Sequence, residues 1–321
     1  MAIQKYNIVI LGGTGFVGKR LCYRLAEEGH KIIVLSRRPE RHRDLEVLPT
    51  LTLKKANIHD ERSLSYYFTN ADVVINLVGI LNAGDFAGKD FDKMHVDVVR
   101  KIISACHIQQ VKQLIHFSAL GANAKDAPSQ YLQTKGKAEE LIIRGQTLHL
   151  RTTIFRPSII IGREADFVNK FNMLLKYAPG VMVLPCARSI SAPVSIIDVI
   201  TADTNSIMNR ECLNKRFDLA GPETYTLKNI VQFMAKAMNK KVWVIGLNTF
   251  FSLCAAQILQ FFPGKPLTPD NVRSSTVPGT SENSFPPELG ITPSAVDELL
   301  KLSIRDEKSH FSFFDKARKM S

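Results

Sequence analysis

Hydrophobic and polar positions alternate between two patterns along the first half of the chain. Short runs of aliphatic and β-branched residues predict buried strands, and longer stretches with apolar residues three and four positions apart predict amphipathic helices. The expected strands are Asn7–Leu11, Lys31–Leu35, Leu51–Ala56, Asp72–Val78, Gln113–Ser118 and His149–Phe155. The expected helices between them are Phe16–Glu28, Glu61–Thr69, Phe91–His107 and Ser129–Arg144. This alternation is typical of an α/β fold with a doubly wound parallel sheet.

The pattern becomes irregular after Arg156, which predicts a second and smaller part of the chain. We expect residues 1–156 to form the first domain, with residues 191–220 returning to its sheet as strands at Ser191–Val194 and Arg216–Leu219. Residues 157–190 and 221–304 would form a smaller, irregular C-terminal lobe, followed by a polar tail at 305–321. Because such sheets bind ligands outside the carboxyl ends of their strands, this lobe is the expected substrate lobe.

Composition narrows the class of protein and of partner. The chain has 321 residues, of which 45% are hydrophobic, so it can bury a large core. Its net charge of +12 favours anionic partners, but the basic residues form no nucleic-acid-binding signature, and we expect no specific nucleic acid. The five scattered cysteines and eight histidines show no metal-ligand spacing, so we expect no metal and no disulfide framework. With no export signal and no apolar run of about 18 residues, a cytoplasmic location is expected.

A glycine-rich loop lies between the first expected strand and the first expected helix. Gly12 permits a tight turn, Gly15 lets the backbone approach a pyrophosphate, and Gly18 lets the helix pack closely on the strand. The helix N-terminus can then direct its N–H groups at phosphate. The loop, completed by Thr14, Phe16 and Val17, predicts a dinucleotide site. A tight turn that binds nothing is the alternative.

The end of the second expected strand indicates which dinucleotide is bound. An NAD site normally has an acidic residue here to hold the ribose 2′-hydroxyl, whereas this chain has Ser36, Arg37 and Arg38. A hydroxyl and guanidinium groups suit a 2′-phosphate, so NADP(H) is preferred over NAD(H). A solvated basic turn is the alternative. By position, Asn57 and Ile58 would contact the adenine, and Val78 and Gly79 would lie beneath the adenosine ribose.

Tyr131 and Lys135 are four residues apart and therefore share one face of an expected helix. The pKa of a free tyrosine, near 10, makes it a poor base at neutral pH. A neighbouring ammonium favours the phenolate, so Lys135 could lower the pKa of Tyr131 and hold the nicotinamide ribose. We therefore expect this pair to be catalytic, with an exposed helix face as the alternative.

Together the glycine loop, Ser118, the Tyr131/Lys135 pair and the Arg156-Pro157-Ser158 strand exit resemble an extended or atypical short-chain dehydrogenase/reductase, whose sheet is a Rossmann fold. More narrowly, the chain is similar to the group that contains the NADPH-binding accessory subunit of respiratory complex I and its bacterial relatives. The segments that carry this narrower likeness are His116–Ala122, Phe155–Ser158, Pro266–Val272 and Leu289–Pro293. The resemblance implies an epimerase-like fold, a bound nicotinamide dinucleotide that Pro157 helps to contact, and Tyr131 and Lys135 as the active pair.

Two positions depart from the family pattern. Leu120 stands where the catalytic Ser or Thr is usual, and His95 stands where an Asn usually serves the proton relay. Ser118 either replaces the missing hydroxyl as a catalytic residue or is structural. We therefore expect an NADP(H)-dependent oxidoreductase acting on a hydrophobic carbonyl or alcohol, such as a quinone, sterol-like or isoprenoid compound. The alternative is a nucleotide-bound accessory or assembly protein of a respiratory or ubiquinone-synthesis complex.

The stretch Asn248–Phe262 predicts a helix that is apolar over most of its circumference. Such a helix is usually part of a core. Next to a ligand site it could instead contact lipid or a lipidic substrate, with the basic surface adding electrostatic attraction. This leaves open a peripheral position at the cytoplasmic face of a membrane or on a membrane complex.

Overall fold

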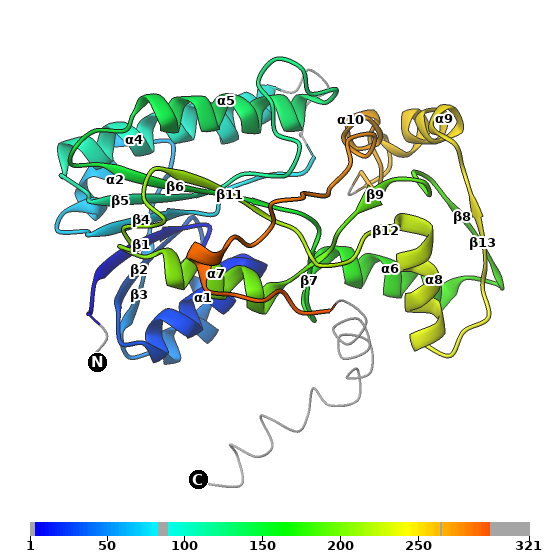
Figure 1. The fold of residues 1–321 in the computed structure, drawn as a ribbon, viewed down its shortest axis with the longest axis horizontal. Helices are drawn as coiled ribbons and strands as arrows, with labels where there is room; N and C mark the ends of the chain where they lie inside the picture. Colours follow the sequence, from blue (N-terminus) through cyan, green and yellow to red (C-terminus); the bar gives the residue numbers. More distant parts are fainter. Residues whose placement is uncertain (1–3, 83–88, 264, 296–321) are drawn as a thin grey trace, which may run out of the picture.

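A central parallel sheet of seven strands organises the computed structural model, which describes residues 4–82, 89–263 and 265–295 (Figure 1). The strands lie in the order β11-β6-β5-β4-β1-β2-β3, and every neighbouring pair is parallel. Their bounds are β1 Asn7–Leu11, β2 Lys31–Ser36, β3 Leu51–Lys55, β4 Val73–Asn76, β5 Gln113–Phe117, β6 Arg151–Pro157 and β11 Lys215–Leu219. The doubly wound Rossmann sheet predicted from the sequence is confirmed.

Helices cover both faces of this sheet (Figure 1). One face is covered by α1 (Phe16–Glu27) and α7 (Ile196–Ser206), the other by α2 (Glu61–Phe68), α4 (Val98–Ile108) and α5 (Gln130–Arg144). Along β1, Ile8 and Ile10 belong to the core on one face, whereas Val9 and Leu11 belong to the core on the other. Strands buried on both sides must be apolar at every position, which explains their continuous hydrophobic runs.

A smaller group of elements, which we call the small lobe, has its own hydrophobic core. It contains α6 (Asp166–Tyr177), α8 (Leu227–Ala237), α9 (Thr249–Leu259) and α10 (Pro269–Ser274), with β8 (Val181–Leu184) paired to β13 (Trp243–Gly246). The remaining two-residue strands are β7 (Ile160–Ile161) with β10 (Val194–Ser195), and β9 (Ile190–Ser191) with β12 (Tyr225–Thr226). Short turns complete the described elements: α3 Lys89–Phe91, the π-helix Asp92–Asp97, and 3₁₀ turns at Pro39–Arg41, Arg43–Val47 and Pro287–Leu289. Within the described ranges, no helix combines the length and apolarity that crossing a bilayer requires.

The sequence prediction for the returning strands is half right. Lys215–Leu219 joins the main sheet beside β6, close to the predicted Arg216–Leu219. The prediction that Ser191–Val194 joins the same sheet is wrong, since this segment is split between β9 and β10. Pro193 lies between the two short strands, and a proline cannot donate a ladder hydrogen bond, so one continuous central strand is disfavoured here. The predicted tail at 305–321 lies outside the described residues.

One buried carboxyl group creates a pH dependence of stability. Asp203 on α7 is fully buried, and neither carboxyl oxygen has a hydrogen-bond partner in the described part of the chain. Burial raises the pKa of Asp203 to about 8. The folded state therefore binds this proton more tightly than the unfolded chain, in which an aspartate titrates near 4.

We predict that the free energy of unfolding falls as the pH rises from about 4 to about 8, because the buried carboxyl must then lose its proton. Asp203→Asn removes this titration, so its stability relative to the native chain should increase steadily across the same range. Urea unfolding at several pH values measures the difference, with the exposed Glu46→Gln as a matched control. Parallel pH profiles for the native chain and Asp203→Asn would contradict the assignment.

Candidate functional site

The glycine loop brings the start of α1 against the end of β1. Gly12 has a φ of +79°, and a Cβ atom on Gly18 would lie 2.5 Å from both the Gly12 carbonyl oxygen and the Gly13 Cα. Only glycine fits at these two positions, which explains the spacing in the sequence. Gly15 is the N-cap of α1 and supplies no side-chain hydrogen bond, whereas α2 and α5 begin with the capping side chains of Asp60 and Ser129. The first turn of α1 is thus open to a ligand.

A cavity of about 810 Å³ opens in front of this loop, within the size range of small-ligand sites. Nine of the residues predicted to bind the cofactor line it: Gly12, Thr14, Gly15, Ser36, Arg37, Arg38, Ile58, Val78 and Gly79. It is also lined by residues that the sequence analysis did not assign: Leu35, Arg41, His42, His59, Leu77, Ile80 and Met94. Arg41 and His42 continue the basic turn after Arg38, so the sequence held a signal for them. Ile80 and Met94 carried no comparable signal.

Several predicted cofactor residues are not part of this lining. Val17 packs on the core of the sheet face that contains Ile8 and Ile10, and Gly18 allows the close helix–strand contact described above. The Asn57 side-chain oxygen accepts the His59 N–H and so shapes the turn. Phe16 packs against both the main core and the small-lobe core. Pro157 ends β6, and its carbonyl oxygen accepts the Leu120 N–H. These residues therefore support the segments that form the cavity and do not line it themselves.

Positive charge dominates the end of β2. Arg37, Arg38 and Arg41 line the cavity there, and the Ser36 hydroxyl oxygen accepts the Arg38 N–H at 3.2 Å. Burial, together with the cations of Lys93, Lys101 and Arg37, lowers the pKa of His59. A neutral imidazole beside several cations is consistent with a strongly positive local potential. This part of the cavity is suited to an anion.

Lys135 lies beside the same cavity. Its Nζ donates to the Phe117 carbonyl oxygen at 2.7 Å, and a Cβ on Gly79, which lines the cavity, would be 3.4 Å from that nitrogen. Burial lowers the pKa of Lys135 to about 8, partly opposed by the charge of Glu139. Burial also raises the pKa of Tyr131 to about 12. The pKa of Tyr131 is therefore shifted in the direction opposite to the lowering expected from Lys135, and burial of the phenol is the cause.

His95, at the position where the resemblance implies an asparagine, packs against Tyr131. It is buried in the π-helical turn Asp92–Asp97, where its Nε2 accepts the Ile80 N–H at 3.2 Å. Nδ1 must then carry the proton and donate to the Thr134 hydroxyl at 2.9 Å. That hydroxyl donates in turn to the Tyr131 carbonyl oxygen, and the His95 ring meets the Tyr131 ring edge to face at 5.6 Å. His95 therefore fixes both the backbone and the ring of Tyr131.

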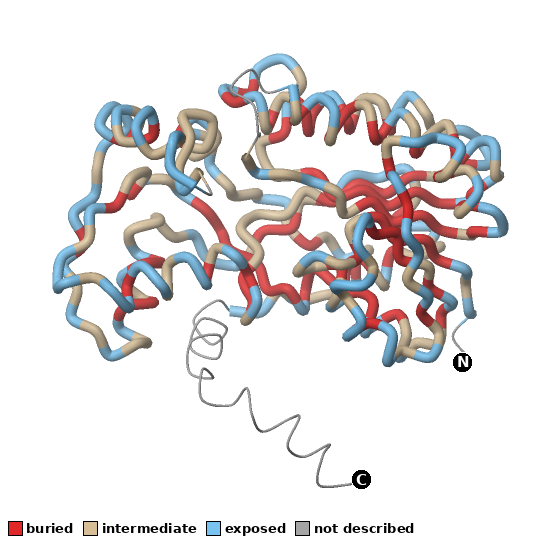
Figure 2. The backbone as a smooth tube through the Cα atoms, turned by 180° about the vertical axis from the view of Figure 1, so that it is seen from behind, coloured by how far each residue is buried: buried red, intermediate tan, exposed pale blue. Residues whose placement is uncertain are grey.

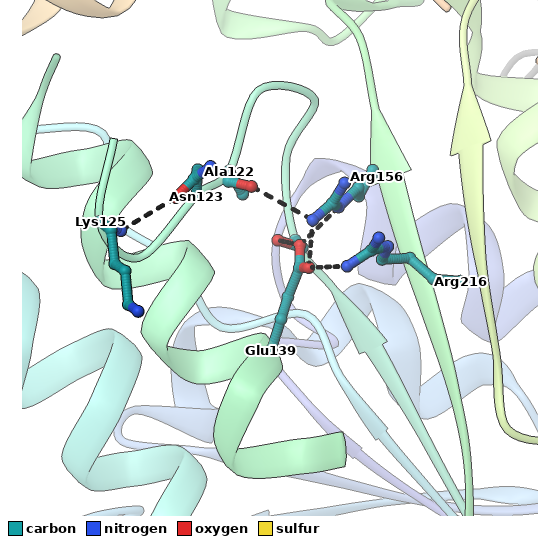
Figure 3. A network of polar contacts seen from close by, with 7 residues as sticks. Ala122, Asn123, Lys125, Glu139, Arg156 and Arg216 are labelled. Carbon is teal, nitrogen blue, oxygen red and sulfur yellow. Dashed lines mark hydrogen bonds and ion pairs between the residues drawn. The ribbon is translucent and has the colours of Figure 1, made fainter. Parts of the chain in front are cut away.

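The Ser118 hydroxyl is engaged in a charged network under the site. It donates to the buried carboxylate of Glu139 at 2.5 Å. Arg156 binds the same carboxylate through two nitrogens, at 2.8 and 2.5 Å, and Arg216 binds it at 3.3 Å (Figure 3). Arg156 also donates to the carbonyl oxygen of Ala122, which ties β6 to the loop after β5. This arrangement favours the structural role of Ser118 over the catalytic one.

The Pro266–Val272 segment holds the beginning of α5. The Asp270 carboxylate accepts the backbone N–H groups of Gln130 and Tyr131, at 2.7 and 3.1 Å. The Ser274 hydroxyl donates to that of Ser129, the N-cap of the same helix. A carboxylate at a helix N-terminus is stabilised by the helix dipole. The small lobe therefore positions the helix turn that carries Tyr131.

Comparison with known proteins agrees with this geometry. Residues 8–177, more than half of the chain, match the model of the NAD dependent epimerase/dehydratase family. A curated relative, the mouse mitochondrial NADH dehydrogenase [ubiquinone] 1 alpha subcomplex subunit 9, is 25% identical over 299 residues, spanning 90% of this chain and 77% of that protein.

Solved structures give the same fold. An NADPH-dependent quinone oxidoreductase from Escherichia coli, complexed with NADPH, superposes with a TM-score of 0.72 at 17% identity, covering 92% of this chain and 99% of that one. A nucleoside-diphosphate-sugar epimerase from Staphylococcus aureus gives a TM-score of 0.73 at 15% identity, covering 92% and 99%. With the family match, the glycine loop and the cavity all in agreement, this chain belongs to the NAD dependent epimerase/dehydratase family.

Proposed function

We propose that this protein is an NADP(H)-binding oxidoreductase that reduces a hydrophobic carbonyl compound, or oxidises the matching alcohol, with a quinone, sterol-like or isoprenoid compound as the substrate class. One observation carries the proposal. A single cavity has a glycine loop and open helix start, a cluster of arginines at the end of β2, and the buried Lys135 beside Gly79. These are the groups that a phosphorylated dinucleotide requires, in the order in which it would meet them.

The preference for NADP(H) follows from the charge at the end of β2. Arg37 and Arg38 line the cavity beside the buried Ser36, where an NAD site would have a carboxylate. A guanidinium binds phosphate through two parallel charge-assisted hydrogen bonds, and neither of the two residues that directly follow this strand is acidic.

In this proposal Tyr131 is the proton donor and Lys135 is the cation that holds the ribose. The bound nicotinamide supplies or accepts the hydride. A phenol with a pKa of about 12 is protonated at neutral pH, which suits the donation of a hydrogen bond and a proton to a carbonyl oxygen. Lys135, with a pKa of about 8, is mostly charged at neutral pH and can donate to hydroxyl groups. His95 and Asp270 position Tyr131 and are not catalytic residues.

A second cavity, of about 270 Å³, is the candidate substrate pocket. Its lining mixes apolar side chains, among them Ile190, Leu247 and Val272, with a larger number of polar residues. Of the polar residues, Arg188 and Thr276 could bind an oxygen atom of the substrate. Val272 of α10 lines this cavity, and Asp270 of the same helix binds the start of α5. Helix α10 therefore links the second cavity to the helix that carries Tyr131.

A specific observation also favours a second candidate function, that of a nucleotide-bound accessory or assembly protein with little or no catalysis. Ser118 is occupied by Glu139 and Leu120 has no hydroxyl, so the usual donor to the substrate carbonyl is missing. The mouse relative, by its name a subunit of the NADH dehydrogenase complex, matches 90% of this chain. Under this candidate function the protein would act in the cytoplasm or at the cytoplasmic face of a membrane, next to a quinone-using or quinone-making complex.

The cofactor assignment predicts that Arg37→Glu weakens NADPH binding by about tenfold or more, because a charge-assisted contact to the 2′-phosphate becomes a repulsion. NADH binding should change little or improve. Titration calorimetry with both cofactors measures this, and Lys31→Glu, at the opposite end of β2, is the matched charge control. Tighter binding of NADH than of NADPH by the native chain would refute the assignment.

Tyr131→Phe distinguishes the two candidate functions. If the chain is a reductase, turnover of a short-chain benzoquinone with NADPH should fall about 100-fold while NADPH affinity is retained, because only the proton donor is removed. The native rate should also decline above a pH of about 8, where Lys135 loses its proton. Steady-state kinetics across pH measures both effects. Turnover by Tyr131→Phe equal to that of the native chain would contradict the catalytic role and favour the accessory function.

A further inference from the structure

One end of the small lobe exposes an apolar sheet face. In the β8–β13 pair, Trp243 lies opposite Val181 and Ile245 opposite Val183, and these four side chains are 73%, 44%, 44% and 56% exposed, in that order. The alternate residues Leu184 and Val244 are buried in the small-lobe core. The two strands are parallel, and parallel strands are normally covered on both faces. This exposed face is therefore suited to contact with an apolar surface.

The next element, α9, extends the same character. Its only fully buried positions are small, Ser252 and Ala256, whereas Phe250, Phe251 and Ile258 are more than half exposed. Phe261 and Phe262, which follow the helix, are also more than half exposed. The sequence alternative that this helix is core is thus wrong, since its large side chains lie outside. Together with the open face of β8 and β13, these residues form what we call the apolar tip, at the end of the molecule where α9, β8 and β13 lie (Figures 1 and 2).

Basic residues predominate around the apolar tip. The segments 167–190 and 224–269, which supply the tip and its surroundings, contain no Asp or Glu, and the acidic residues Asp166, Glu223 and Asp270 lie just outside them. The two segments contain eight basic residues: Lys170, Lys176, Arg188, Lys228, Lys236, Lys240, Lys241 and Lys265. Lys240 and Lys241 lie just before the strand that begins at Trp243. An exposed apolar surface with an excess of cations around it is complementary to an interface that is apolar inside and anionic at its border.

We propose that the apolar tip docks on the surface of an anionic phospholipid membrane. Aromatic and aliphatic side chains would enter the boundary between headgroups and acyl chains, with Trp243 at the depth that suits its amphipathic ring, and the lysines would meet the lipid phosphates. A second copy of the chain is a poorer occupant, because a two-fold contact brings the same cationic surface against itself. The proposal deepens the membrane position considered under the proposed function by naming the docking surface and the lipid charge.

Docking in this orientation has a consequence for the substrate. Leu247, Asn248 and Thr249 lead into α9 and also line the 270 Å³ cavity. The cavity would then lie next to the membrane surface, where a hydrophobic quinone, sterol-like or isoprenoid compound is concentrated.

The test is co-sedimentation of the full chain with vesicles of phosphatidylcholine alone or with 30% phosphatidylglycerol, a composition chosen on the order of cytoplasmic-leaflet anionic content. We expect binding only to the anionic vesicles, and weaker binding as the salt concentration rises. The double variant Phe261→Ser/Phe262→Ser should bind about tenfold less tightly, since its apolar insertion is lost. Lys241→Glu should also weaken binding. The matched controls are Leu148→Gln and Lys31→Glu. Leu148 is an 83% exposed apolar residue between α5 and β6, and Lys31 is an exposed residue at the start of β2.

Thermal unfolding of the same variants shows whether they are folded, and calorimetry with NADPH on them separates this test from the cofactor assignment. Equal vesicle binding by the tip variants and their controls would overturn the proposal, as would binding that ignores phosphatidylglycerol. Absence of binding to any vesicle would also overturn it and leave an acidic protein surface as the occupant.

Discussion

The close approach of α1 to the end of β1 is the contact on which the site depends. Gly18 has no room for a single extra carbon atom, because the backbone of Gly12 and Gly13 would lie within about 2.6 Å of it. This approach places the uncapped start of α1 at the wall of the large cavity, where its N–H groups and positive dipole end face a ligand. The order of strands then brings the ends of β2 and β4 to the same edge, with arginines on one side and Gly79 on the other.

The proposed acid–base pair is held by contacts that come from separate parts of the chain. Lys135 is fixed by the Phe117 carbonyl at the end of β5, and Tyr131 by His95 from the π-helical turn and by Asp270 from the small lobe. Further along the same helix, Glu139 is clamped by Arg156 and Arg216 from β6 and β11. Because each support comes from a different element, α5 can be held rigidly while the side chains of Tyr131 and Lys135 remain desolvated. That desolvation keeps the Tyr131 phenol protonated and eases the loss of the Lys135 proton.

Local patterns were sufficient to predict the sheet and much of the dinucleotide cavity. Continuous apolar runs identify strands buried on both faces, and the glycine spacing together with the Ser36-Arg37-Arg38 sequence identifies six of the sixteen residues that line the cavity, because these signals lie within a few residues of the groups they describe. The partner of Ser118 could not be predicted. Glu139 is 21 residues away, and the arginines that bind it come from two later strands. The contact of Asp270 with Tyr131 spans 139 residues. The structural role of the Pro266–Val272 motif could therefore not be predicted, although the motif indicated a family resemblance.

Two errors have physical causes that a periodic pattern does not contain. Pro193 interrupts the predicted strand at Ser191–Val194, so its two halves pair with different partners. The pKa of Tyr131 moves up instead of down because burial of the phenol depends on the rings of Phe91 and His95 packed around it, which is a tertiary property. The apolar stretch at Asn248–Phe262 was ambiguous between core and interface for the same reason, since only the packing of α9 shows that Ser252 and Ala256, not the phenylalanines, face inward.

The most direct measurement of the central claim is a calorimetric titration of the folded native chain with NADPH and, separately, with NADH. The account predicts saturable heat for one molecule of NADPH per chain and weaker binding of NADH, because both dinucleotides place a pyrophosphate at the start of α1 but only one carries a 2′-phosphate. A folded protein that gives no saturable heat with either dinucleotide would contradict the claim that this glycine turn and helix start form a pyrophosphate site.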